Sequence, residues 1–126
     1  MAGTLTNTDA RIAGLAHELT IDLTSTAGGA VTEDTTVKVG GFILQVGIRP
    51  DSGGTQPTDQ FDLVINDAYG RDILRAGGGN LSNASDTWLT PVIDDGLVFV
   101  NSLLSIALSN AGDSKGVTVV IYWAEL

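Results

Sequence analysis

Apolar and polar residues alternate along much of this chain with a period of two, which predicts β-strands. Around residues 18–24, Leu19, Ile21 and Leu23 share one face while polar side chains occupy the other. Because strand side chains point alternately to opposite faces, this pattern indicates a strand with one buried and one solvated side. Comparable patterns predict further strands at residues 35–39, 42–49, 60–67, 87–93, 97–100 and 103–109. The inward residues predicted for the strands at 60–67 and 103–109 are Phe61, Leu63 and Ile65, and Leu104, Ile106 and Leu108.

The strongest strand pattern is the C-terminal run, residues 116–126. Its inward face is predicted to carry Val117, Val119, Ile121 and Trp123. The opposite face is also largely apolar, whereas a solvated face normally carries charged residues. The pattern therefore predicts a second cover, which in a domain this small could come from another subunit. The predicted subunit-interface residues are Val120, Tyr122 and Ala124.

The strand over residues 42–49 is predicted to bury Phe42, Leu44, Val46 and Ile48. Gly47 falls on its opposite face, where another group can approach the backbone closely. Two glycine-rich loops, residues 51–58 and 77–86, separate the strands that follow. The three consecutive glycines at 77–79 favour a long and mobile loop.

The fold predicted from these patterns is all-β, because about eight or nine strands recur at short spacings and no convincing helix appears. The spacing is typical of a single-domain antiparallel β-sandwich, jelly-roll-like in strand order, although it leaves an immunoglobulin-like topology open. Residues 1–16 show no clear period and are predicted to form an extended N-terminal arm before a β-sandwich domain over residues 17–126. The arm could be a frayed terminus or could reach onto a neighbouring subunit.

Charge and composition exclude several partners. The chain has 15 acidic and 6 basic residues, for a formal net charge of -9, and the basic residues are scattered. Nucleic-acid binders need a basic patch to contact phosphates, so we expect no binding to DNA or RNA. No stretch is apolar enough to span a membrane, and residues 1–16 lack the features of a secretory signal. We expect a product made in the cytoplasm that does not bind a membrane.

Histidine and cysteine give little support for catalysis or metal binding. The chain has no cysteine, and His17 is its only histidine, placed far in sequence from the glycine-rich loops. A Ser-His-Asp triad needs a histidine near a nucleophile, and a zinc site needs several histidine or cysteine ligands. We therefore predict a structural role for His17, no enzymatic activity and no cofactor or metal.

Several acidic residues lie close together in sequence. Three pairs resemble ligand pairs: Asp59 with Asp62, Asp67 with Asp72, and Asp94 with Asp95. None has the spacing of a calcium-binding loop, whereas aspartate is a common residue for capping turns. We predict that these carboxylates cap turns.

Four aromatic residues, Tyr69, Trp88, Tyr122 and Trp123, could form a sugar-binding platform. Trp123 falls on the face predicted to be buried, which favours the core or an interface for it. The pattern leaves the positions of Tyr69 and Trp88 open.

One segment of the chain resembles small virion proteins of tailed bacteriophages. The matching positions in residues 57–74 are Pro57, Thr58, Asp59, Phe61, Asp62, Asp67, Gly70, Asp72, Ile73 and Leu74, with Gln60 as an additional residue. Residues 104–122 are similar to the closing hairpin of the same proteins, so the resemblance covers a little over half of the chain. The C-terminal Trp-Ala-Glu-Leu departs from the basic ending usual in that family.

The resemblance implies a non-enzymatic virion structural protein, most simply a capsid decoration (cement) protein on the capsid surface, made in the host cytoplasm. It implies the major capsid protein as partner and a homotrimer as the oligomer. The arm residues expected to contact the capsid are Leu5, Arg11, Ile12 and Leu15. Two alternatives remain open: a phage tail, neck or fibre protein, and a carbohydrate-binding or adhesin-like β-sandwich module.

Overall fold

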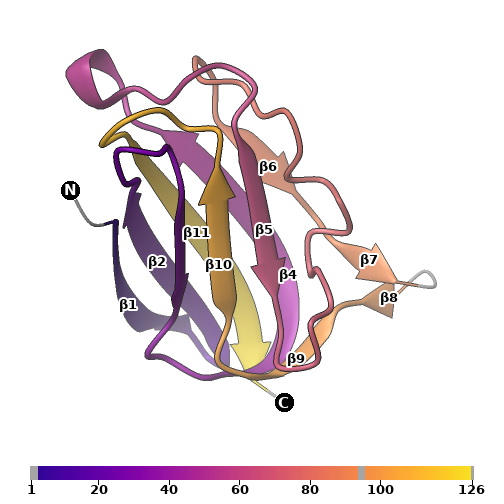
Figure 1. The fold of residues 1–126 in the computed structure, drawn as a ribbon. Helices are drawn as coiled ribbons and strands as arrows, with labels where there is room; N and C mark the ends of the chain where they lie inside the picture. The colour runs from indigo at the N-terminus through magenta and orange to yellow at the C-terminus, as the bar shows by residue number, and fades with distance from the viewer. Residues whose placement is uncertain (1–2, 94–95, 126) are drawn as a thin grey trace.

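The computed structural model describes residues 3–93 and 96–125 and shows an all-β protein with two antiparallel sheets (Figure 1). The large sheet has the strand order β1-β2-β11-β4-β6, and β9 pairs with the first part of β4. Its strands are β1 (Thr4–Ala13), β2 (Ala16–Thr24), β4 (Val39–Pro50), β6 (Thr87–Leu89), β9 (Phe99–Ser102) and β11 (Gly116–Glu125). Within the described ranges, no helix is both long and apolar enough to cross a bilayer.

The small sheet has the strand order β3-β10-β5 and faces the inner side of the large sheet (Figure 1). It consists of β3 (Val31–Asp34), β5 (Asp62–Asn66) and β10 (Ser105–Ser109). A short hairpin, β7 (Val92–Ile93) with β8 (Gly96–Leu97), projects beside the body, and η1 (Gly53–Thr55) is a single 3-10 turn. The polar strand predicted at residues 35–39 falls earlier, in β3.

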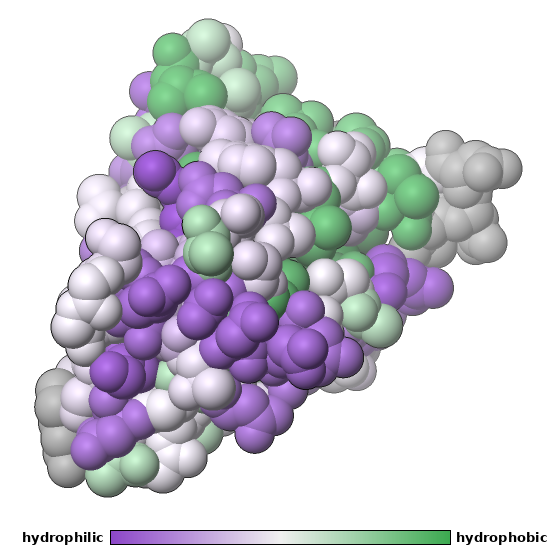
Figure 2. Space-filling view, turned by 90° about the horizontal axis from the view of Figure 1, so that it is seen from above, coloured by the Kyte–Doolittle hydropathy of each residue, from purple (hydrophilic) through white to green (hydrophobic). Residues whose placement is uncertain are grey.

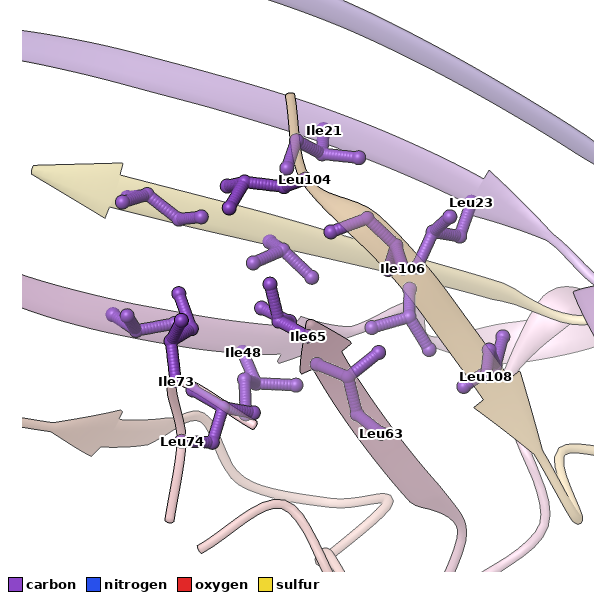
Figure 3. Packing of buried hydrophobic residues seen from close by; sticks show 14 of the residues in the cluster. Ile21, Leu23, Ile48, Leu63, Ile65, Ile73, Leu74, Leu104, Ile106 and Leu108 are labelled. Carbon is purple, nitrogen blue, oxygen red and sulfur yellow. The ribbon is translucent and has the colours of Figure 1, made fainter. Parts of the chain in front are cut away.

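The hydrophobic core lies between the two sheets, and both contribute side chains to it (Figure 3). Four of the predicted inward faces are confirmed as buried. They are Leu19, Ile21 and Leu23 of β2; Phe61, just before β5, with Leu63 and Ile65 of β5; Leu104, just before β10, with Ile106 and Leu108 of β10; and Val117, Val119, Ile121 and Trp123 of β11. The period-of-two pattern was sufficient there because those strands run without interruption.

Strand β4 departs from simple alternation. Tyr122 of β11 pairs with Gln45, but Trp123 pairs with Ile43, so Leu44 is an extra residue in the ladder. Such a β-bulge exchanges the two faces of the strand on either side of it. As a result Ile43 is fully buried, while Phe42 and Leu44 are only half-buried. The predicted burial was therefore wrong for Phe42 and Leu44, and it is confirmed for Val46 and Ile48.

The segment predicted to be an extended arm differs in the structure, where it forms edge strand β1. It pairs with β2 from Thr4–Thr24 to Ala13–Ala16. The side-chain oxygen of Asn7 accepts hydrogen bonds from the backbone N–H groups of Thr36 and Val37, at 3.2 and 3.3 Å. The inner face of β1 carries polar residues with specific partners in place of a repeating apolar pattern, so hydrophobic periodicity could not reveal this strand.

Candidate functional site

The outer face of the large sheet carries an exposed tryptophan, Trp88, on edge strand β6. Across the strands, Val120 pairs with Gly47, and Gly47 pairs with Trp88. The six-membered ring of Trp88 lies over Gly47, so close that a Cβ placed on that glycine would collide with Cζ3 of the ring. The predicted close approach at Gly47 is therefore confirmed, and the approaching group is the indole of Trp88.

Trp88 and Tyr122 together form what we call the aromatic platform. Their rings are nearly parallel, at 16°, with centroids 6.4 Å apart. Trp88 is 44% exposed, whereas Val120 beside it is only 8% exposed. Hydrogen bonding to Glu18, the cross-strand partner of Tyr122, raises the pKa of the phenol. The platform is thus a partly solvated aromatic surface.

A polar cleft adjoins the aromatic platform. It has a volume of about 390 Å³ and is lined by Arg49, Pro50, Asp51, Ser52, Thr55, Asp86 and Thr118. Arg49 follows Gly47 by two residues, and Asp86 precedes Trp88 by two residues. Two residues of extended backbone span roughly 6.6 Å. The Nε of Arg49 donates a hydrogen bond to Oδ2 of Asp86 at 3.0 Å. Platform and cleft therefore lie next to each other.

The cleft presents hydrogen-bond donors and acceptors side by side. Oδ2 of Asp51 accepts a hydrogen bond from the Thr55 hydroxyl at 3.0 Å. The Thr118 hydroxyl donates to Oδ1 of Asp22 at 2.9 Å. Carboxylates accept, guanidinium groups donate and hydroxyls do both, so the cleft can match a ligand that carries many hydroxyl groups.

The predicted subunit-interface residues lie on this same outer face. Val120 is already covered, and it pairs with Gly47, over which the ring of Trp88 lies. Tyr122 belongs to the aromatic platform, while Ala124 lies further down the sheet, paired with Phe42. The role of these three residues between subunits stays a prediction.

A second surface, which we call the apolar end, lies where the β1–β2 turn, β9 and the C-terminus meet, at the bottom of Figure 1. Phe99 pairs with Phe42, which pairs with Ala124, and the backbone of Glu125 bonds to that of Leu15. The exposed apolar and aromatic side chains at this end are Ile12, Leu15, Tyr69, Phe99 and Leu103. A hollow of about 190 Å³ lies between Tyr69 and Phe99.

The four residues predicted to contact a capsid are divided by the structure. Ile12 and Leu15 are more than half exposed, at 53% and 57%, and lie at the apolar end. Leu5 packs against the core, and Arg11 forms an ion pair with Glu125 at 3.1 Å. Of these four predicted residues, only Ile12 and Leu15 therefore present apolar surface for docking.

His17 lies between two carboxylates at the edge of the core. Its Nδ1 is 2.7 Å from Oδ2 of Asp9, and its Nε2 is 2.8 Å from Oε1 of Glu125. Its ring stacks on Trp123 at 4.1 Å, and the indole N–H of Trp123 donates to Oδ1 of Asp9 at 2.9 Å. Burial alone would lower the pKa of His17, but the hydrogen bonds and negative charges of Asp9 and Glu125 outweigh it and raise that pKa. These contacts join β1, β2 and β11.

The aspartates that resemble ligand pairs cap turns and loops, as predicted, wherever the structure describes them. Asp59 accepts a hydrogen bond from the backbone N–H of Asn83, and Asp72 accepts hydrogen bonds from the backbone N–H groups of Leu74 and Ala76. Asp67 accepts the N–H groups of Tyr69 and Arg71.

Asp62 accepts the backbone N–H of Asn80 and the amide of Asn110, which lower its pKa. Asp94 and Asp95 lie outside the described residues. Within residues 3–93 and 96–125, no cluster of three or more histidines or acidic residues is arranged to hold a metal ion.

Comparisons with protein-family models, with curated proteins and with solved structures gave no match. The two surfaces above are therefore the features that bear on function. Sequence patterns singled out Trp88 and Gly47 but missed Arg49, Asp86 and Thr118, which come together from three strands or loops. Arg49 and Thr118 lie on the outward face of their strands, and Asp86 ends the loop at residues 77–86, so no motif marked them in the sequence.

Proposed function

We propose that this chain is a non-enzymatic structural protein of a tailed-phage virion that decorates the capsid surface after synthesis in the host cytoplasm. The observation that carries this proposal is the apolar end, where five large side chains are each at least 39% exposed. Exposed apolar side chains gathered at one end of a protein are typical of protein–protein docking sites. The resemblance of residues 57–74 and 104–122 to small phage virion proteins supports the same conclusion.

The proposed partner is the major capsid protein. Burying apolar side chains such as Ile12 and Leu15 against the capsid would stabilise it by about 25 cal/mol for each Å² of apolar surface removed from water. Because only the assembled lattice offers neighbouring subunits at the right spacing, this binding energy would favour the assembled state. No bond is made or broken.

The proposed attachment has a direction. Hydrophilic side chains cover much of the end of the molecule near η1, although apolar ones gather beside the β7–β8 hairpin (Figure 2). The apolar end would face the capsid, so the η1 end would face solvent. A jelly-roll-like β-sandwich and a homotrimer belong to this proposal, with neighbouring copies in contact near Ala124 and Phe99.

The test is co-sedimentation of the purified protein with capsids of the phage that encodes it. We expect saturable binding to mature capsids, and at least a tenfold loss in the double variant Ile12→Ser with Leu15→Ser. Val64→Ser is the matched control, because Val64 is an exposed apolar residue on the small sheet, away from the apolar end.

Binding to isolated tails or necks but not to capsids would instead assign the chain to the tail, neck or fibre class. Equal binding by the double variant and the wild-type chain would remove the apolar end as the docking surface.

A further inference from the structure

We propose that the aromatic platform and its polar cleft form a binding site for a neutral oligosaccharide. This site is separate from the apolar end, so it adds to the proposed capsid attachment and does not depend on it. Trp88 and Tyr122 would hold the apolar face of a pyranose ring, and the cleft residues would bond its hydroxyl groups.

The shape of the platform fits a sugar ring. A pyranose presents a flat face of C–H groups surrounded by hydroxyls, and an aromatic ring offers a flat apolar surface of similar size. The six-membered ring of Trp88 lies over Gly47 while the residue stays 44% exposed, and the ring of Tyr122 is nearly parallel to it. Gly47 makes this possible, since any larger residue would push the indole away from the sheet.

The cleft supplies the polar contacts that orient a ligand. Its volume of about 390 Å³ falls in the range common for small-molecule sites, which combine apolar walls with a few placed polar groups. Arg49 and Asp86 already bond to each other through a single Nε–Oδ2 contact. Further guanidinium N–H groups of Arg49 and lone pairs of the carboxylates are suited to sugar hydroxyls.

The charge around the site favours a neutral glycan over an acidic one. Glu18, Asp22, Asp51 and Asp86 surround the platform and cleft, and Arg49 is the cationic residue among the cleft's lining residues. The whole chain carries a formal charge of -9. A sugar that bears carboxylates or sulfates would be repelled by this surface.

The same charges argue against a second copy of the chain as the occupant. Cores of protein interfaces are depleted in charged residues, and burying unpaired carboxylates is costly. Two identical copies meeting at this face would place these carboxylates close to one another. A hydroxyl-rich ligand leaves the carboxylates hydrogen-bonded and partly solvated.

The experiment is to apply the labelled, full-length protein to a printed array of neutral and acidic glycans, and to measure affinities for the bound glycans by calorimetry. We expect binding to one or more neutral glycans, with at least a tenfold loss of affinity in Trp88→Ala and a clear loss in Arg49→Gln. Tyr69→Ala is the matched control, because Tyr69 is 88% exposed but far from the platform, and it should bind like the wild type.

Several results would overturn the site. These are binding to no glycan, binding to acidic glycans only, or equal loss in Tyr69→Ala and Trp88→Ala. If Trp88→Ala fails to fold, Arg49→Gln and Asp86→Asn decide the outcome, because their side chains are 57% and 39% exposed. A Trp88→Ala variant that changes the mass in solution while glycan binding persists would assign the face to a second copy of the chain.

Discussion

His17 contacts a carboxylate with each ring nitrogen, and this makes folding stability depend on pH in a defined direction. A neutral imidazole has one N–H, so only the protonated form can donate to both Asp9 and Glu125. The folded-state pKa is raised, so the stabilisation is complete below the unfolded-state pKa of about 6.5 and is lost as pH rises through the folded-state value.

We therefore expect the free energy of unfolding, measured by urea titration, to be higher at pH 6 than at pH 9. His17→Gln should lose about 1.5–3 kcal/mol at pH 6, typical of hydrogen bonds to charged groups, and should show little pH dependence over this interval. His17 is the only histidine, so few other groups titrate there. A variant that retains the full pH dependence would contradict this assignment.

Gly47 determines where Trp88 can lie, which gives a second prediction for a single residue. Gly47→Ala would place a methyl group inside the indole ring, and we expect a loss of about 1–3 kcal/mol in stability, typical of overpacking. Gly40→Ala is the matched control on the same strand, because its nearest neighbour is the Asn101 side chain at 3.8 Å. Thermal unfolding of both variants checks this, and equal losses would count against the close packing of Trp88 on Gly47.

At the scale of whole strands, the bulge in β4 predicts a reversal of ordinary alternation. Ile43 is fully buried and Leu44 half-buried, although alternation from Val46 places Leu44 inward. Ile43→Ala should therefore destabilise the protein by about 2–5 kcal/mol, and Leu44→Ala by about 1 kcal/mol. Chemical denaturation of the two variants distinguishes the structure from simple alternation, which demands the opposite order.

Uninterrupted strands could be predicted from the sequence, and elements held by polar contacts could not. β2, β10 and β11 repeat apolar residues at every second position, and their buried faces were identified correctly. β1 is stabilised by Asn7, Asp9 and Arg11, whose partners lie far along the chain, so no local pattern revealed it.

The loop at residues 77–86 illustrates the same limit. Its glycines predicted mobility, yet the backbone of Gly78 bonds to Leu63, and a Cβ on Gly78 would collide with the Leu63 carbonyl. Asp62 and Asp59 also accept N–H groups from Asn80 and Asn83 in this loop. A glycine run therefore allows close packing as readily as it allows motion.

Only part of the candidate site could be predicted from the sequence, because its residues meet through long-range strand pairing. Trp88 and Gly47 were identified one at a time, but their contact depends on the register between β4 and β6. The cleft joins residues from β4, β11 and two loops, and only the assembled sheet brings them together.

For the molecule as a whole, the proposed trimer predicts a mass in solution. Light scattering should give about three times the 13.0 kDa of one chain. The variant Ile12→Ser with Leu15→Ser separates two uses of the apolar end. A lower mass would place contacts between copies there, and an unchanged mass with lost capsid binding would leave that end to the capsid. A wild-type monomer would contradict the trimer.

The extra residue in β4 also limits how this protein can change over evolutionary time. Before the bulge β4 pairs with β9, and after it β4 pairs with β6, so Leu44 sets the phase between two parts of one sheet. Deleting it would turn Ile43 and the residues before it to the wrong face. Substitutions in β4 are therefore more tolerable than any change in its length, and related chains should vary in sequence there while keeping the residue count constant.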